Sequence, residues 1–192
     1  MATFECIYLL NNTVDTPIQS DVSTIKYPCT GFCYMVINNK EKIVSKYLVG
    51  KQKDYYELIK SLIENACDRK KLNKNISEEG EYIDEITVKN DFTTITNKIY
   101  YKESCIVSDI DMDNFCYDLS EMLLTVPILG CMIVNRSSET ILFIKIDNDT
   151  FLTIDSHQSK HGTVNYEDAI KYITRGGLSR GVIQTGIYNP YI

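Results

Sequence analysis

Hydrophobic residues along the chain fall into short runs whose spacing alternates between helical and strand-like. The clearest helical pattern spans 54–67, where apolar residues recur at intervals of three and four and Asp54 can cap the first turn. A second pattern of this kind spans 112–125, and a third, shorter one spans 165–174. We predict a helix at each of these three segments.

Strand-like runs occupy much of the remaining chain. Residues 130–135 and 140–147 are apolar runs separated by a short polar turn, which predicts a hairpin near the centre of a sheet. Residues 148–157 are predicted as a third neighbouring strand. Segments 4–10 and 86–101 have the composition of further strands. Strands and helices mixed in this way predict an α+β domain.

The segments between these elements are mostly polar or broken by glycine and proline. Residues 11–21 read as a polar connection, 68–85 as a long charged loop, and the chain after 174 as a glycine-broken tail. The apolar run 32–38 fits either a buried helix or a strand. We expect a single domain over 1–192, which could be the leading domain of a longer protein.

Composition narrows the classes of partner. With 192 residues and 44% hydrophobic content, the chain is long enough to bury one sizeable core. Its formal charge of -6 opposes nonspecific attraction to phosphate backbones, so nucleic acid is not an expected partner. The local basic patch at 69–74 is interpreted as a solvated loop. We found neither a long apolar run nor a basic leader, and we therefore expect no membrane association.

Seven cysteines form an odd number without tight paired spacing. With no secretory signal, this pattern is typical of reduced thiols in a cytosolic or nuclear protein. Cys29 and Cys33 lie close together, but a closed zinc site would need more ligands than any nearby segment offers. We expect no metal and no cofactor.

The stretch "FLTIDSHQSKHG" carries the best candidate chemistry. On a strand, Asp155 and His157 share a face, which brings the carboxylate within reach of one imidazole nitrogen. An aspartate so placed fixes the tautomer of a catalytic histidine and stabilises its imidazolium form. The other histidine, His161, is expected to be a solvated side chain in a loop. The same pattern also fits a strand that simply ends in polar residues.

Cysteine is the expected nucleophile, because a thiol beside an imidazole ionises readily. Cys33 follows Gly31 at a predicted entry from loop to helix, where a helix N-terminus favours a thiolate and backbone N–H groups can hold an oxyanion. Cys29, which follows Pro28, is the second choice. Spacing alone ranks Cys33 first and leaves Cys29 open.

Three stretches of this chain resemble the herpesvirus tegument deubiquitinases and related papain-like cysteine proteases of other large DNA viruses. "TGFCYMVIN" is similar to the family's nucleophile loop and first helix, and "YLVGKQKDYYELI" to the helix that follows. "NDTFLTIDSHQSKHGTVNYEDAIKYI" is similar to the strand with aspartate and histidine, its loop and the next helix. The resemblance implies a papain-like fold with a central, mostly antiparallel sheet flanked by helices.

The resemblance also implies roles for individual residues. Cys33 corresponds to the nucleophile, His157 to the general base and then acid, and Asp155 to the orienting carboxylate. Gln19 occupies a place comparable to that of the glutamine that supports the oxyanion in this family. The implied reaction is hydrolysis of the bond after the C-terminal glycine of ubiquitin or a ubiquitin-like modifier, in the cytoplasm or nucleus of an infected host cell or in association with the virion.

Three functions remain open from the sequence. The first is a monomeric thiol-dependent deubiquitinase acting on ubiquitin, a ubiquitin-like protein or their conjugates. The second is a catalytically inactive relative that binds ubiquitin or a host protein, and the third is a structural or assembly domain. Ubiquitin's basic C-terminal tail calls for acidic contacts, and the acidic side chains of 78–85 are candidates, although they also fit a solvated loop.

Overall fold

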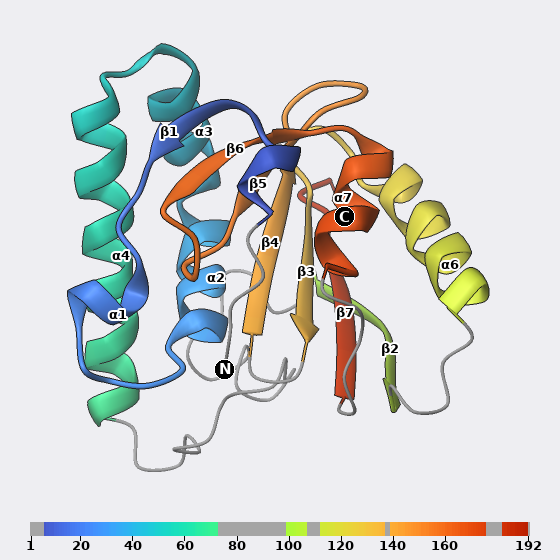
Figure 1. The fold of residues 1–192 in the computed structure, drawn as a ribbon, viewed down its shortest axis with the longest axis horizontal. Coiled ribbons are helices and arrows are strands. Elements are labelled where there is room, and N and C mark those ends of the chain that lie inside the picture. Colours follow the sequence, from blue (N-terminus) through green and yellow to red (C-terminus); the bar gives the residue numbers. More distant parts are fainter. Residues whose placement is uncertain (1–5, 73–98, 107–111, 137–138, 176–181, 192) are drawn as a thin grey trace.

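The computed structural model describes residues 6–72, 99–106, 112–136, 139–175 and 182–191. One seven-stranded antiparallel sheet runs through it, with helices on both faces (Figure 1). The strands, in spatial order, are β1 (Asn11–Asp15), β6 (Lys160–Val164), β5 (Phe151–Ile154), β4 (Glu139–Lys145), β3 (Cys131–Arg136), β7 (Val182–Tyr188) and β2 (Ile99–Ile106). The helices are η1 (Ile7–Leu9), α1 (Gln19–Val22), α2 (Cys29–Asn38), α3 (Lys40–Val49), α4 (Gln52–Leu72), α6 (Met112–Thr125) and α7 (Tyr166–Ile173). The predicted α+β class is confirmed.

The three predicted helices are confirmed as α4, α6 and α7. Helix α7 shows how local sequence sets such an element. The Asn165 side chain caps it by accepting a hydrogen bond from the backbone N–H of Asp168 at 2.8 Å. Ala169, Tyr172 and Ile173 then recur at helical spacing and are buried.

The predicted hairpin and its neighbour are confirmed as β3, β4 and β5. Cys131 pairs with Ile144, and Leu142 pairs in turn with Ile154, so the three strands follow one another in the sheet. All three are buried along nearly their whole length, because helices cover both faces.

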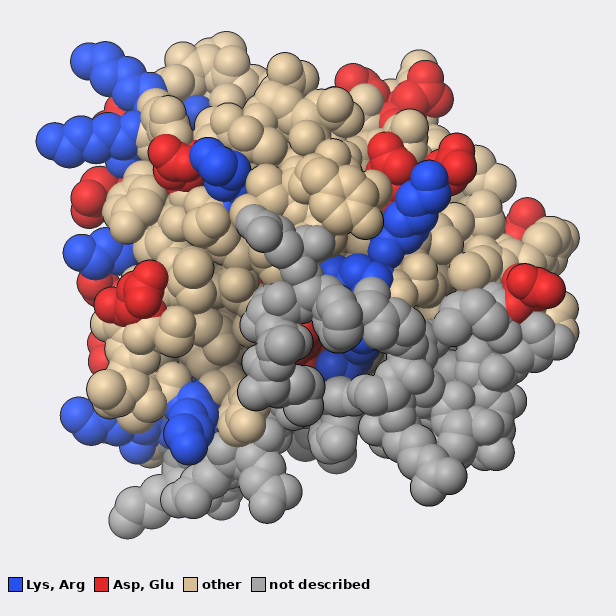
Figure 2. Space-filling view, in the orientation of Figure 1, with Lys and Arg blue, Asp and Glu red and all other residues tan. Residues whose placement is uncertain are grey.

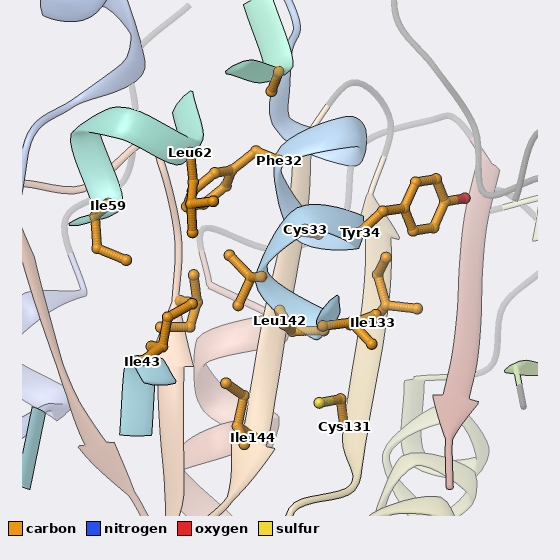
Figure 3. Close-up of a cluster of buried hydrophobic side chains, with 14 of the residues drawn as sticks. Phe32, Cys33, Tyr34, Ile43, Ile59, Leu62, Cys131, Ile133, Leu142 and Ile144 are labelled. Atoms are coloured by element: carbon orange, nitrogen blue, oxygen red, sulfur yellow. The ribbon is translucent and has the colours of Figure 1, made fainter. Parts of the chain in front are cut away.

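The two faces of the sheet bury two separate cores. Ile133, Leu142 and Ile144 point to one face and pack beneath α2 and α4 (Figure 3). Met132 and Phe143, their sequence neighbours, point to the other face, where α6 and α7 pack. Side chains alternate between the faces because a strand repeats every two residues. The end of β5 therefore lies between the two helical layers.

Several sequence predictions differ from the structure. Residues 7–9 of the predicted strand 4–10 form a 3-10 helix, and the strand comes later, as β1 in the polar connection 11–21. The signal for β1 was weak because this exposed strand lies at the sheet edge, where backbone pairing with β6 suffices. The predicted tail contains β7, which inserts between β3 and β2.

Other differences concern the segments around α2 and α4. The apolar run 32–38, left open as helix or strand, belongs to α2. Residues 68–72 of the predicted loop extend α4, while 73–98 lie outside the described residues. Within the predicted strand 86–101, the described part begins with β2. Among the described helices, none has the length and apolar character needed to cross a membrane.

Candidate functional site

Asp155 and His157 meet at the turn that follows β5. Oδ1 of Asp155 accepts a hydrogen bond from Nδ1 of His157 at 2.7 Å and another from its backbone N–H at 3.0 Å. Because these two bonds hold the ring and the backbone of the same residue, the imidazole has a fixed orientation. The sequence hypothesis that Asp155 orients His157 agrees with this geometry.

Burial and charge act in opposite directions on this pair. The Asp155 side chain is fully buried, and burial alone would raise its pKa. His157 and then Arg175 reverse this and hold the pKa of the carboxyl well below its usual range. Burial opposes charge on His157 as well, yet Asp155 and then Cys29 raise the pKa of its imidazole well above the usual value. Asp155 is therefore ionised, and it stabilises the charged form that His157 takes when its ring accepts a proton.

Cys29 is the thiol that contacts His157. It forms a side-chain hydrogen bond with the imidazole. Because Asp155 occupies Nδ1, the ring nitrogen left for the thiol is Nε2. Cys29 is the first residue of α2, and in Figure 1 the turn between β5 and β6 lies beside this helix.

Cys33, the first choice from the sequence, does not reach His157. Its side chain is fully buried among the apolar residues beneath α2, as Figure 3 shows. Its Sγ donates to the carbonyl oxygen of Thr140 at 3.7 Å, and burial raises its pKa well above the usual value. A raised pKa disfavours the nucleophilic thiolate. Cys29, the second choice from the sequence, is thus the thiol that lies against His157.

The helix begins about one turn earlier than predicted. Gly31, the predicted junction between loop and helix, lies inside the first turn of α2. A β-carbon at Gly31 would lie 2.7 Å from a guanidinium nitrogen of Arg69, so the glycine makes room for the side chain of α4. The helix instead starts directly after Pro28, a residue that commonly precedes or opens helices.

Gln19 lies next to the same turn. Its side-chain oxygen accepts a hydrogen bond from the hydroxyl of Ser156 at 2.6 Å. Its backbone N–H donates to the carbonyl oxygen of Ser156 at 2.8 Å. These two contacts hold α1 against the Asp-Ser-His segment, and the Gln19 amide group remains a candidate donor for an oxyanion.

The loop before Cys29 has an unusual backbone and is held by α4. Tyr27 has a φ of 58°, a left-handed conformation that is strained for a bulky residue. Lys70 donates to the backbone oxygens of Lys26 at 2.5 Å and Tyr27 at 3.2 Å and lies over the Tyr27 ring. The basic patch at 69–74, predicted as a solvated loop, therefore begins in the last turn of α4. Figure 2 shows Lys and Arg side chains gathered on the side where α4 lies in Figure 1.

His161 is buried rather than solvated. It lies in β6, and its Nδ1 is 2.7 Å from the Tyr55 hydroxyl while its Nε2 is 3.1 Å from the carbonyl oxygen of Asp155. Burial lowers its pKa to about 4, so the ring is neutral near pH 7. The prediction of a loop failed because β6 is a short strand whose sequence is polar.

Three further residues lie on the Oδ2 side of Asp155, and no sequence pattern marked them as part of a site. Tyr172 and Arg175 both donate to Oδ2 of Asp155, and Glu139 pairs with Arg175. Tyr172 follows the apolar spacing of α7 and reads as a core residue, while Arg175 lies in what read as the start of a tail. Their convergence depends on how α7 packs against the sheet.

No protein-family model matches this chain, and no curated protein matches it significantly. Within the described part of the chain, no cluster of three or more His, Cys, Asp or Glu side chains is arranged to hold a metal ion.

Proposed function

We propose that the chain is a cysteine peptidase of papain-like type in which Cys29 is the nucleophile, His157 the general base and acid, and Asp155 the orienting carboxylate. The observation that carries the proposal is the continuous contact from thiol to imidazole to carboxylate. The nucleophile at the start of a helix and the histidine beside a sheet strand also agree with a papain-like arrangement.

The proposed reaction proceeds in two balanced steps. Sγ of Cys29 attacks the carbonyl carbon of the scissile bond, and its proton passes to Nε2 of His157. When the C–N bond breaks, the amine leaves with the proton that His157 returns, and a thioester remains on Cys29. Water then attacks the thioester and transfers a proton to His157, which returns it to Cys29 as the carboxylic acid product departs.

The negative oxygen of each tetrahedral intermediate needs hydrogen-bond donors. Backbone N–H groups at a helix N-terminus point along the axis toward such a position, and Cys29 opens α2. The Gln19 side-chain amide is the proposed second donor, because its oxygen is already engaged by Ser156 at the same turn. Gln19 thus keeps the role that the resemblance implies, whereas the proposed nucleophile is Cys29, one helical turn before Cys33.

We propose ubiquitin or a ubiquitin-like protein as the substrate class. The support is the resemblance of three stretches to viral deubiquitinases: one contains Asp155 and His157, and Cys29 directly precedes another, which begins at Thr30. The acidic side chains expected to contact the basic tail of ubiquitin, 78–85, lie outside the described residues.

A second function is favoured by one observation. Cys29 is 1% exposed, so a carbonyl carbon can reach its sulfur only if the surroundings move. A binding module that keeps the fold without turnover, recognising ubiquitin or a host protein, would tolerate such a buried thiol.

Reaction with ubiquitin that bears a thiol-reactive C-terminus separates the two functions. We expect a covalent adduct by intact mass with the parent protein and none with Cys29→Ala. His157→Ala should slow adduct formation by about 100-fold or more, because the thiol loses its base. Cys33→Ala is the matched control, because it removes a thiol one helical turn away and should still form the adduct.

Loss of the adduct in Cys33→Ala with its retention in Cys29→Ala would reject the proposed nucleophile. If the parent protein binds ubiquitin but forms no adduct, the chain is a binding module.

A further inference from the structure

The two oxygens of the Asp155 carboxylate are held by different groups. Oδ1 accepts from the ring and backbone nitrogens of His157. Oδ2 accepts from the hydroxyl of Tyr172 at 2.7 Å and from Nη2 of Arg175 at 3.2 Å. With four donors on a side chain that is 0% exposed, the carboxylate is fixed in rotation and in position.

The Arg175 guanidinium is itself held in one place. Its Nη1 donates to the backbone oxygen of Tyr172 at 2.9 Å, and its centre lies 4.7 Å from the centre of the Tyr172 ring. Its Nη2 is also 3.2 Å from Oε2 of Glu139 on β4. Arg136 of β3 donates to the backbone oxygen of Arg175 at 2.7 Å and of Ile173 at 3.0 Å. The segment after α7 is therefore fastened to the central hairpin.

We propose that Arg175 is a positioning residue of the site, which holds Asp155 by its second oxygen and limits how tightly His157 retains a proton. This inference rests on the proposed peptidase function. A buried carboxylate with no other cation beside it would stabilise the imidazolium strongly. His157 has to release its proton to the leaving amine, so a second cation on the same carboxylate favours that step.

The groups that face this pair come from all the surrounding elements. They are Cys6 before η1, Cys29 of α2, Arg136 of β3, Glu139 of β4, His161 of β6, Tyr172 of α7 and Arg175 after it. Arg175 is the cation of this set that contacts the Asp155 carboxylate, whereas Arg136 contacts the backbone oxygens of Ile173 and Arg175. Removal of Arg175 should therefore dominate any change in the proton affinity of His157.

NMR of the imidazole nitrogens tests this directly, because the chain has two histidines and His161 stays neutral near pH 7 as an internal reference. The titration is followed in a Cys29→Ala background, which removes the thiol from His157. Adding Arg175→Gln should raise the titration midpoint of His157 by about one pH unit, the scale of a nearby charge effect. Arg175→Lys, which keeps the cation, should stay close to the background.

Arg136→Lys is the structural control, since it loosens the same segment through its backbone contacts, keeps the cation and should leave the midpoint unchanged. A midpoint that is unchanged or lower in Arg175→Gln would overturn the proposal, as would an equal rise in Arg136→Lys. If Arg175→Gln does not fold, Tyr172→Phe replaces it. This variant removes a donor from the same oxygen and should raise the midpoint too, and an unchanged midpoint would overturn the proposal.

A kinetic comparison separates this inference from the proposed function. In the background with Cys29 intact, Arg175→Gln should lose more kcat on an amide of the ubiquitin C-terminus than on an ester, because the amine leaving group needs the proton of His157. Equal losses on both would count against the role of Arg175. A parent protein that cleaves neither would reject the peptidase function and leave the titration result standing.

Discussion

At the residue scale, the two histidines have opposite environments although they are near neighbours in sequence. His157 faces a carboxylate that stabilises its charged form. His161 is enclosed by Tyr55, Thr16 and the backbone of Asp155, none of which offers it a counter-charge close enough to offset burial. One histidine is therefore suited to proton transfer and the other to holding β6 against α4.

The His161 environment predicts a pH-dependent stability. Its pKa is lowered in the folded state to about 4 from an ordinary value near 6.5, so its contribution to stability is complete above pH 6.5 and is lost as pH falls toward 4. Between pH 7 and pH 5 the free energy of unfolding should fall by about 2 kcal/mol more in the parent than in His161→Gln. Urea unfolding at both pH values measures this difference, and equal changes in the two proteins would contradict it.

At the element scale, the start of one helix and the end of one strand make the site. Helix α2 packs on β4 and α4, and this packing sets where Cys29 lies relative to the turn after β5. Edge strands are tied more loosely, and the β1–β6 pair depends on a close approach of backbones. A β-carbon at Gly162 would lie 2.7 Å from the backbone oxygen of Asn11.

Two glycine substitutions distinguish backbone contacts from side-chain contacts. Gly162→Ala should lower the free energy of unfolding by about 1–3 kcal/mol, because the backbone of β1 cannot withdraw without losing its pairing. Gly31→Ala is the matched control. Its new methyl group meets the mobile end of Arg69, and alanine is the better helix former, so its cost should be smaller. Equal losses in thermal or urea unfolding would contradict this account.

At the scale of the whole molecule, a late segment of the chain completes the sheet. Strand β7 pairs with β3 on one side and with β2 on the other, so it joins β2 to the central strands. The order of strands in space therefore differs from their order in sequence. Strand β2 joins the central strands only when β7, near the end of the chain, has paired with both.

Removal of 177–192 should therefore abolish cooperative unfolding, because β2 and the β3 edge both lose their pairing partner. Circular dichroism during urea unfolding would report the loss as a shallow transition without a defined midpoint. Removal of Tyr191 and Ile192 alone should preserve a cooperative transition, since Tyr191 is largely exposed. A cooperative, native-like transition in the longer deletion would show that β7 is dispensable.

The sequence by itself determined the helices and strands in which hydrophobic residues recur at a regular spacing. Helices α4, α6 and α7 and the strands β3, β4 and β5 follow from apolar spacing, which reflects burial on one or both faces. The contact between Asp155 and His157 was also predicted, but for a different reason: the strand ends at Ile154, and the two residues meet in the turn that follows it rather than on one face of a strand. These are local relations, and local sequence is enough to fix them.

Only the tertiary structure decided which thiol contacts the His157 imidazole and which residues bind the second oxygen of the Asp155 carboxylate. Cys29 and Cys33 lie one turn apart on the same helix, so sequence spacing cannot rank them. The packing of α2 on the sheet directs one to His157 and the other to Thr140. Arg175 reaches Asp155 because α7 packs against the sheet and its end lies beside the turn after β5. Such contacts join distant residues, and their geometry is set by packing rather than by any local pattern.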